Sequence, residues 1–146
     1  MIDTVVVATD GSESVARAVD VALDLAARFD ADVHALSVLD ESEVENAPAE
    51  LRAEMSSALS TRANAALSDV TTRTTREVTT AIREGRPADE IIAYAREVDA
   101  DLVATGTRGR HGENRLLIGS VAERVVRTCP VPVLTVRRLA DDEFAG

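Results

Sequence analysis

The sequence predicts a single α/β domain, a doubly wound parallel sheet with helices on both faces. Short apolar or β-branched runs alternate along the chain with longer segments of helical period, the order that produces parallel sheets. The 146 residues match the size of one domain and show no internal repeat or interdomain linker. Hydrophobic residues make up 45% of the composition, enough to build a packed core rather than a disordered chain.

The first elements follow from the N-terminal third. Residues 5–8 form a continuous apolar run, as expected for a central strand buried on both faces. Residues 10–12, Asp-Gly-Ser, combine turn and helix-capping chemistry. The next apolar residues recur every three or four positions, as on one face of a helix: Val15, Val19, Ala22, Ala26 and Phe29. A second strand is predicted for residues 33–38, and the acidic, proline-containing segment 40–48 is expected to be a loop.

The middle of the chain predicts two more helices around a third strand. The stripe of the second helix is Leu51, Met55, Leu59, Ala63, Ala66 and Val70. Residues 74–82 are rich in β-branched side chains, and Val78, Thr80 and Ile82 would share one side of a strand near a sheet edge. Gly85 and Pro87 mark a turn and a helix start. That helix continues through Ile91, Ile92, Ala95 and Val98.

The last third predicts strand, loop, helix and strand. Residues 102–105 read as a buried strand, followed by a long glycine-containing loop. A helix should begin near Ser120 and end before Pro130, and residues 133–136 make the last strand. We expect the domain to span residues 1–139 and to be followed by a polar tail, residues 140–146.

The charge is unusual, because the net charge is −10 and all sixteen basic residues are arginine. Such a surface repels nucleic-acid phosphates and anionic lipids, so neither nucleic acid nor a membrane is an expected partner. An acidic surface without lysine suggests a halophilic protein, whose self-repulsion is screened at high salt. The alternative is a GC-rich genome that favours arginine codons.

No run of about 18 apolar residues suggests a membrane span, and the N-terminus lacks the basic region of a signal peptide. A cytoplasmic location is therefore expected. Cys129 is the only cysteine, which excludes an internal disulfide. His34 and His111 are the only histidines, and their surroundings do not indicate a zinc site.

Two predicted strand ends carry the residues of a candidate ligand site. In a parallel sheet, ligands bind beyond the carboxyl ends of the strands. The first strand runs into Thr9 and Asp10, whose carboxylate can accept hydrogen bonds from a ribose hydroxyl. The fourth strand leads into Gly106 and Gly109, which let backbone amides approach a charged group. Ser120 opens a helix whose free N–H groups favour phosphate.

Each of these features also has a purely structural interpretation. Asp10 or Ser12 can cap the first helix, and Ser120 with Glu123 forms a capping-box pattern that needs no ligand. The two glycines can simply turn a loop. The spacing by itself leaves both interpretations open.

The segment 106–137, GTRGRHGENRLLIGSVAERVVRTCPVPVLTVR, closely resembles the C-terminal signature of the universal stress protein family. ATP-binding members carry Gly, two residues, Gly, nine residues, and then Gly followed by Ser or Thr. Gly106, Gly109, Gly119 and Ser120 match every spacing. The N-terminal run VVVATDGSESVARAVDVALDLA and the turn at residues 85–87 resemble the same family, so the likeness covers essentially the whole chain.

The resemblance implies a fold and a ligand. The fold is a five-stranded Rossmann-like sheet of the adenine-nucleotide-hydrolase type, in the order 3-2-1-4-5. The ligand is ATP, alone or with Mg²⁺, with Asp10 at the adenosine end and the backbone near Val38 against the adenine. The residues that it implies around the phosphates are Gly106, Arg108, Gly109, Gly119 and Ser120. Thr9, Thr105 and Val121 are expected neighbours.

The resemblance also implies a homodimer through the last strand, from Val133 to Val136, and an unknown protein partner. The leading functional hypothesis is a nucleotide-dependent regulator of the stress response, because no Walker A element is present and the chain has no lysine. One alternative is a slow ATP-hydrolysing enzyme of the same superfamily. The other is a scaffold member that does not depend on ATP.

Overall fold

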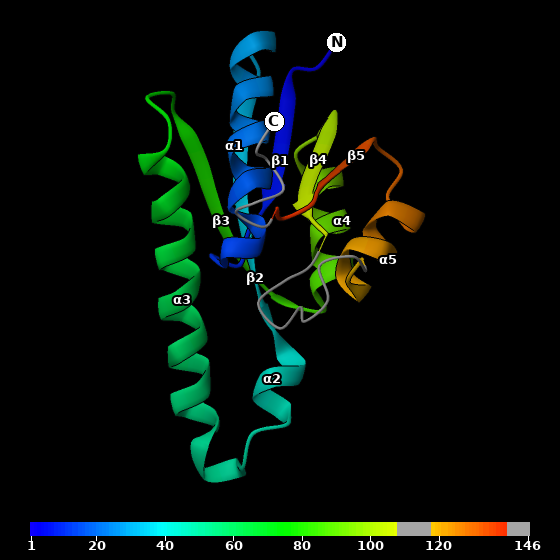
Figure 1. The fold of residues 1–146 in the computed structure, drawn as a ribbon. Coiled ribbons are helices and arrows are strands. Elements are labelled where there is room, and N and C mark those ends of the chain that lie inside the picture. Colours follow the sequence, from blue (N-terminus) through cyan, green and yellow to red (C-terminus); the bar gives the residue numbers. More distant parts are fainter. Residues whose placement is uncertain (108–117, 140–146) are drawn as a thin grey trace.

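The structure is a computed structural model that describes residues 1–107 and 118–139. Five parallel strands form one sheet in the order β3-β2-β1-β4-β5, which confirms the predicted fold class and strand order (Figure 1). The strands are β1 (Thr4–Ala8), β2 (Asp32–Asp40), β3 (Val78–Gly85), β4 (Leu102–Gly106) and β5 (Val133–Val136). The order switches direction at β1, so the carboxyl ends of β1 and β4 lie side by side.

Helices cover both faces of this sheet (Figure 1). They are α1 (Glu13–Phe29), α2 (Glu41–Glu45), α3 (Arg52–Thr72), α4 (Pro87–Glu97) and α5 (Ser120–Thr128), with a short 3₁₀ turn at Ala49–Leu51. Side chains of α1 and α3 share one core cluster, and side chains of α4 and α5 share another. Among the described residues, no helix is both long and apolar enough to cross a membrane.

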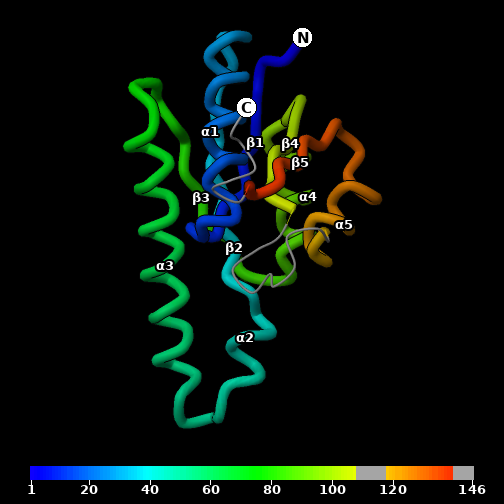
Figure 2. The backbone as a smooth tube through the Cα atoms, in the orientation of Figure 1, coloured from blue at the N-terminus to red at the C-terminus, as the bar shows by residue number. Residues whose placement is uncertain are grey.

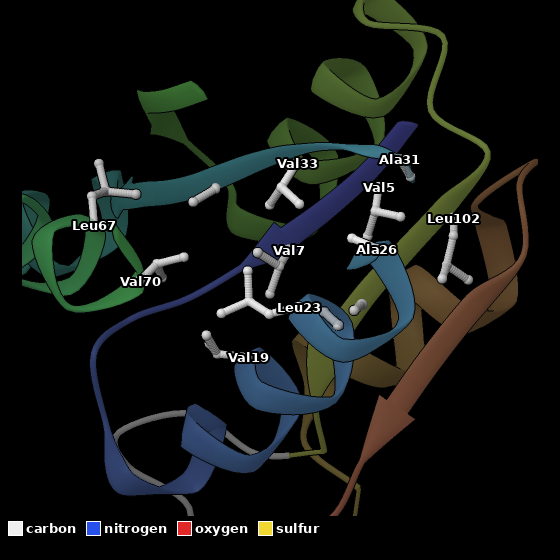
Figure 3. Close-up of a cluster of buried hydrophobic side chains, with 13 residues drawn as sticks. Val5, Val7, Val19, Leu23, Ala26, Ala31, Val33, Leu67, Val70 and Leu102 are labelled. Atoms are coloured by element: carbon white, nitrogen blue, oxygen red, sulfur yellow. The ribbon is translucent and has the colours of Figure 1, made fainter. Parts of the chain in front are cut away.

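The alternation of β1 explains the two clusters. Val5 and Val7 point to the face covered by α1 and α3, where they pack with Val19 of α1 and Val70 of α3 (Figure 3). Val6 points to the other face, against α4 and α5. All three β1 valines are fully buried, as the continuous apolar run predicted.

Helix α3 is longer than the sheet is deep. Its first half, together with α2, lies beyond the carboxyl ends of the strands (Figure 2). Its second half packs on the sheet through Leu67 and Val70. The overhang forms a wall beside the edge of the sheet where ligands of this fold class bind.

Several sequence expectations were wrong in detail. Phe29, placed on the buried face of the first helix, is 51% exposed, because the buried stripe of α1 ends at Ala26. The expected loop 40–48 contains α2, which begins where the Asp40 carboxylate accepts a hydrogen bond from the Ser42 N–H at 3.0 Å. Likewise Leu51 is 44% exposed, because it precedes the part of α3 that reaches the sheet.

The third strand begins later than predicted. Thr74 forms a turn instead, in which its Oγ1 accepts a hydrogen bond from the Arg76 N–H at 3.1 Å. Thr80, expected beside Val78 and Ile82, is exposed, whereas those two residues are half-buried. The position of β3 at the sheet edge is as predicted. Gly85 ends the strand at a φ of +151°, a conformation that favours glycine.

Candidate functional site

A pocket of about 450 Å³ lies at the carboxyl ends of β1, β2 and β4. It is bounded by the sheet edge, by the starts of α4 and α5, and by the overhanging α2 and α3. Thr9, directly after β1, and Thr105, the second-last residue of β4, are 7% and 8% exposed and line it. The pocket therefore occupies the switch point that the fold class predicts for a ligand.

The turn after β1 places Asp10 at the pocket. The Thr9 N–H donates to the Leu36 carbonyl at 2.9 Å, which ties the end of β1 to β2. The Gly11 N–H then donates to Thr9 Oγ1 at 3.1 Å, and Gly11 adopts a φ of 77°. The Ser12 N–H donates to Asp10 Oδ1 at 2.9 Å, so one carboxylate oxygen holds the turn. Ser12 occupies the N-cap position of α1, as one of the two capping interpretations expected, but its side chain makes no capping hydrogen bond.

The other side of the pocket is the start of α5. The Gly119 N–H donates to the Thr107 carbonyl at 2.5 Å, which brings the helix start back beside the end of β4. Gly119 is the N-cap, and no side chain of the described residues caps the helix. The capping box of Ser120 and Glu123 was therefore a wrong interpretation, since Ser120 lies inside the helix and Glu123 pairs with Arg127. The first N–H groups of α5 are left for another acceptor.

Most of the predicted site residues line this one pocket. They are Thr9, Asp10, Val38, Thr105, Gly106, Gly119, Ser120 and Val121. Arg108 and Gly109 lie outside the described residues, as does the predicted tail, residues 140–146. The backbone around Val38 enters the pocket because β2 runs on to Asp40, two residues beyond the predicted end of that strand.

Sequence reasoning missed the wall made by α2 and α3. Leu59, Arg62 and Ala63 of α3 line the pocket, as does Glu43 of α2. Leu59 and Ala63 belonged to the predicted apolar stripe, and Arg62 shares their face because it lies three residues after Leu59. That spacing was the available signal. It could not be used without knowing that α3 extends past the sheet.

Two buried hydroxyl groups that lie close in the sequence to pocket residues lack a hydrogen-bond partner in the described part of the chain. Among the described residues they are Ser12 Oγ, two residues after Asp10, and Thr107 Oγ1, directly after Gly106. A buried hydroxyl without a partner is costly, and a ligand oxygen at this edge of the sheet would satisfy it. The uncapped start of α5, which lines the pocket, fits an anionic group.

The comparisons with known proteins decide the family. The model of the universal stress protein family matches residues 1–137. The chain belongs to the universal stress protein family.

This universal stress protein is similar to relatives along almost its whole length. It is 38% identical over 138 residues to a universal stress protein of Methanocaldococcus jannaschii, covering 92% of this chain and 81% of that one. The solved structure of UspA from Lactobacillus plantarum is 27% identical, with a TM-score of 0.78 and coverage of 93% and 98%. A universal stress protein crystallised in complex with cAMP is 29% identical, with a TM-score of 0.69 and coverage of 94% and 98%.

Proposed function

We propose that this universal stress protein binds ATP in the pocket and acts as a nucleotide-dependent regulator of the stress response. The observation that carries the proposal is the convergence of two chemistries at one switch point. A carboxylate, Asp10, follows β1, and the uncapped start of α5 lies beside the end of β4. A carboxylate suits ribose hydroxyls and free amides suit phosphate, which together describe a nucleotide.

The choice of an adenine nucleotide rests on the glycine pattern and on the family. Gly106, Gly119 and Ser120 match the spacing of the ATP-binding members. A relative that is 29% identical was crystallised with cAMP, which supports the adenine class. Any Mg²⁺ would arrive with the phosphates and keep several water ligands. In the described part of the chain, no group of three metal-binding side chains offers a separate site.

We propose a role as regulator because the chain has a candidate phosphate site but lacks the lysine of a Walker A loop. Nucleotide occupancy would then alter the surface that a protein partner meets.

We also propose a cytoplasmic homodimer joined through β5. This strand is an edge strand that pairs only with β4 among the described residues, and a two-fold partner would cover it.

The test of ligand identity begins with the protein purified without added nucleotide. It is denatured, and the released small molecules are identified by mass spectrometry. We expect ATP or ADP in amounts close to one per chain. If the protein is empty and a titration with ATP and Mg²⁺ produces neither heat nor a thermal shift, the ATP proposal is wrong and the scaffold alternative leads.

The enzyme alternative needs a separate assay. Multiple-turnover consumption of ATP is measured with the protein in large molar deficit. Turnover near or above about 1 s⁻¹ is typical of a working catalyst and would contradict the role as regulator. We expect turnover far below that value.

A further inference from the structure

Arg62 of α3 is placed to contact a ligand rather than the protein. It lines the pocket from an exposed position, flanked on its helix face by the buried residues Leu59 and Ala63. Within the described part of the chain it makes no hydrogen bond and no ion pair. Another arginine near the end of α3, Arg73, behaves differently and pairs with Asp69 at 2.8 Å and with Asp20 at 2.9 Å.

The charge of Arg62 is also unusual at this place. Among the described residues that line the pocket, Arg62 is the only basic one, and it faces a lining that contains Asp10, Asp40 and Glu43. A guanidinium always carries its charge and presents a flat, delocalised group. Arg62 lines a cavity of about 450 Å³.

The topology places Arg62 at the nucleoside end of the pocket. Helix α3 packs on β2, whereas the glycines and the start of α5 lie at the end of β4. The order of the sheet puts β1 between β2 and β4, so the ends of these two strands are about 10 Å apart at a spacing of about 4.8 Å per strand. A nucleotide with its phosphates at Ser120 would bring its base toward Val38 and the wall of α3.

A bound base would find no aromatic side chain among the described residues of the pocket. The only tyrosine, Tyr94, packs in the core beside His34, and Phe29 is exposed at the end of α1. Bases in protein sites commonly stack on aromatic rings or on arginine planes. Arg62 is the one side chain of the described lining that offers a planar cation of this kind.

We propose that the Arg62 guanidinium stacks on the base of the bound nucleotide and is a specificity-determining residue of the pocket. This inference rests on the proposed nucleotide function. It assigns α3 to recognition of the base and leaves recognition of the phosphates to the glycines and α5. Lysine would not replace arginine, because an ammonium group carries the charge without the plane.

The test compares the affinities of the parent, Arg62→Ala and Arg62→Lys for adenosine and for ATP, measured by calorimetry. Both variants are expected to lose about tenfold in affinity, by the same factor for the two ligands, since stacking does not depend on the phosphates. Arg96→Ala is the matched control, because Arg96 is exposed on α4 and does not line the pocket. Its affinities should equal those of the parent.

Two results would overturn the inference while leaving nucleotide binding intact. The first is a loss that is larger for ATP than for adenosine and is restored by lysine, which would make Arg62 a charge partner of the phosphates. The second is no loss in either variant. If the parent protein binds neither ligand, the proposed function fails as well, and the two failures are thus distinguishable. Unfolding temperatures within about 3 °C of the parent would show that the variants are folded.

Discussion

Ser120 is the first residue of α5, and its backbone N–H belongs to the uncapped turn that faces the pocket. A carboxylate at this position would interact favourably with the helix dipole, yet it would repel phosphate from the same amides. Stability and ligand binding should therefore respond to such a change in opposite directions.

We predict that Ser120→Asp lowers the affinity for ATP by at least about tenfold, because one unfavourable charge contact costs more than 1.4 kcal/mol in a shielded site. The affinity for adenosine should change much less. The unfolding temperature should stay the same or rise, as measured by differential scanning calorimetry. Ser120→Asn is the neutral control, and an equal loss of ATP affinity in both variants would contradict a role for charge.

Tyr94 allows a second single-residue test, which concerns the pH dependence of stability. Its side chain is 4% exposed, and its Oη lies 2.8 Å from Nδ1 of His34. Burial raises the pKa of the Tyr94 phenol above its ordinary value near 10, with a smaller increase from Glu97 and an opposing effect from Arg83. It is the only tyrosine of a chain without lysine, so few other groups titrate near this pH.

The sign of the effect follows from the raised pKa. The unfolded chain ionises Tyr94 first, so the stabilisation is fully present below about pH 10 and is lost as the pH rises above it. We predict that Tyr94→Phe flattens this alkaline loss of the free energy of unfolding, measured by urea unfolding between pH 9 and pH 11 (about one unit on each side of the ordinary pKa). At pH 7 the variant should lose about 1 kcal/mol with the His34 hydrogen bond. Parallel pH curves for the two proteins would show that Tyr94 does not cause the loss.

Helix α3 shows how burial can change along one element. Leu67, in its second half, is 5% exposed and packs in the core shared with α1, whereas Leu51, directly before the helix, is 44% exposed. Leu51 belonged to the apolar stripe predicted for this helix, whereas Leu67 did not. The difference in exposure arises because only the second half of α3 lies on the sheet (Figure 2).

We predict that Leu67→Ala lowers the free energy of unfolding by about 2–5 kcal/mol, the usual cost of a cavity in a packed core. The same change at Leu51 should cost less than about 1 kcal/mol, because its side chain is already largely in water. Urea unfolding of the two variants provides the measurement. Equal costs would mean that the first half of α3 is packed as tightly as the second.

The helices and strands show which parts of the fold the sequence patterns could predict. Continuous or periodic apolar runs predicted every strand and the long helices, because burial against the sheet imposes those patterns. Helix α2 was missed because five residues are too short for a period, and a single Asp40 cap stabilises its start. Phe29 was misplaced because a period does not reveal where a helix passes the edge of its sheet.

The candidate site was predictable at the strand ends and not along the helices. Asp10 and the glycine spacing lie directly after buried strands, where parallel topology brings distant segments together. Arg62 lies in the middle of a long helix, where an arginine normally faces solvent. Its contact with the pocket depends on the overhang of α3, a property of element lengths in space.

The charge of the whole molecule leads to a prediction about salt. Twenty-six acidic residues face sixteen arginines, so the folded chain repels itself at low ionic strength. We propose a halophilic protein and predict that the unfolding temperature rises as KCl increases toward 1 M, where the screening length falls to about 3 Å. Calorimetry across a KCl series checks this. An unfolding temperature that does not change with KCl would favour the alternative, a GC-rich genome whose codons favour arginine.

A second prediction for the whole molecule concerns its oligomeric state. The exposed edge at β5 should be covered by a second copy, which gives twice the chain mass of 15.5 kDa in light scattering. Thr135→Pro, in the middle of β5, should reduce that mass to one chain, because proline removes an N–H from the edge. A parent protein that scatters as a monomer at micromolar concentration would contradict the proposed dimer.

Calorimetric titration of the nucleotide-free protein with ATP and Mg²⁺ is the decisive test of the claim that the pocket at the strand ends binds ATP. We predict saturable heat with one nucleotide per chain and an affinity that falls at least about tenfold in Ser120→Asp. A folded parent protein that gives no heat with ATP would contradict the claim. Saturable binding that the variant leaves unchanged would place the phosphates away from α5 and contradict the site as described.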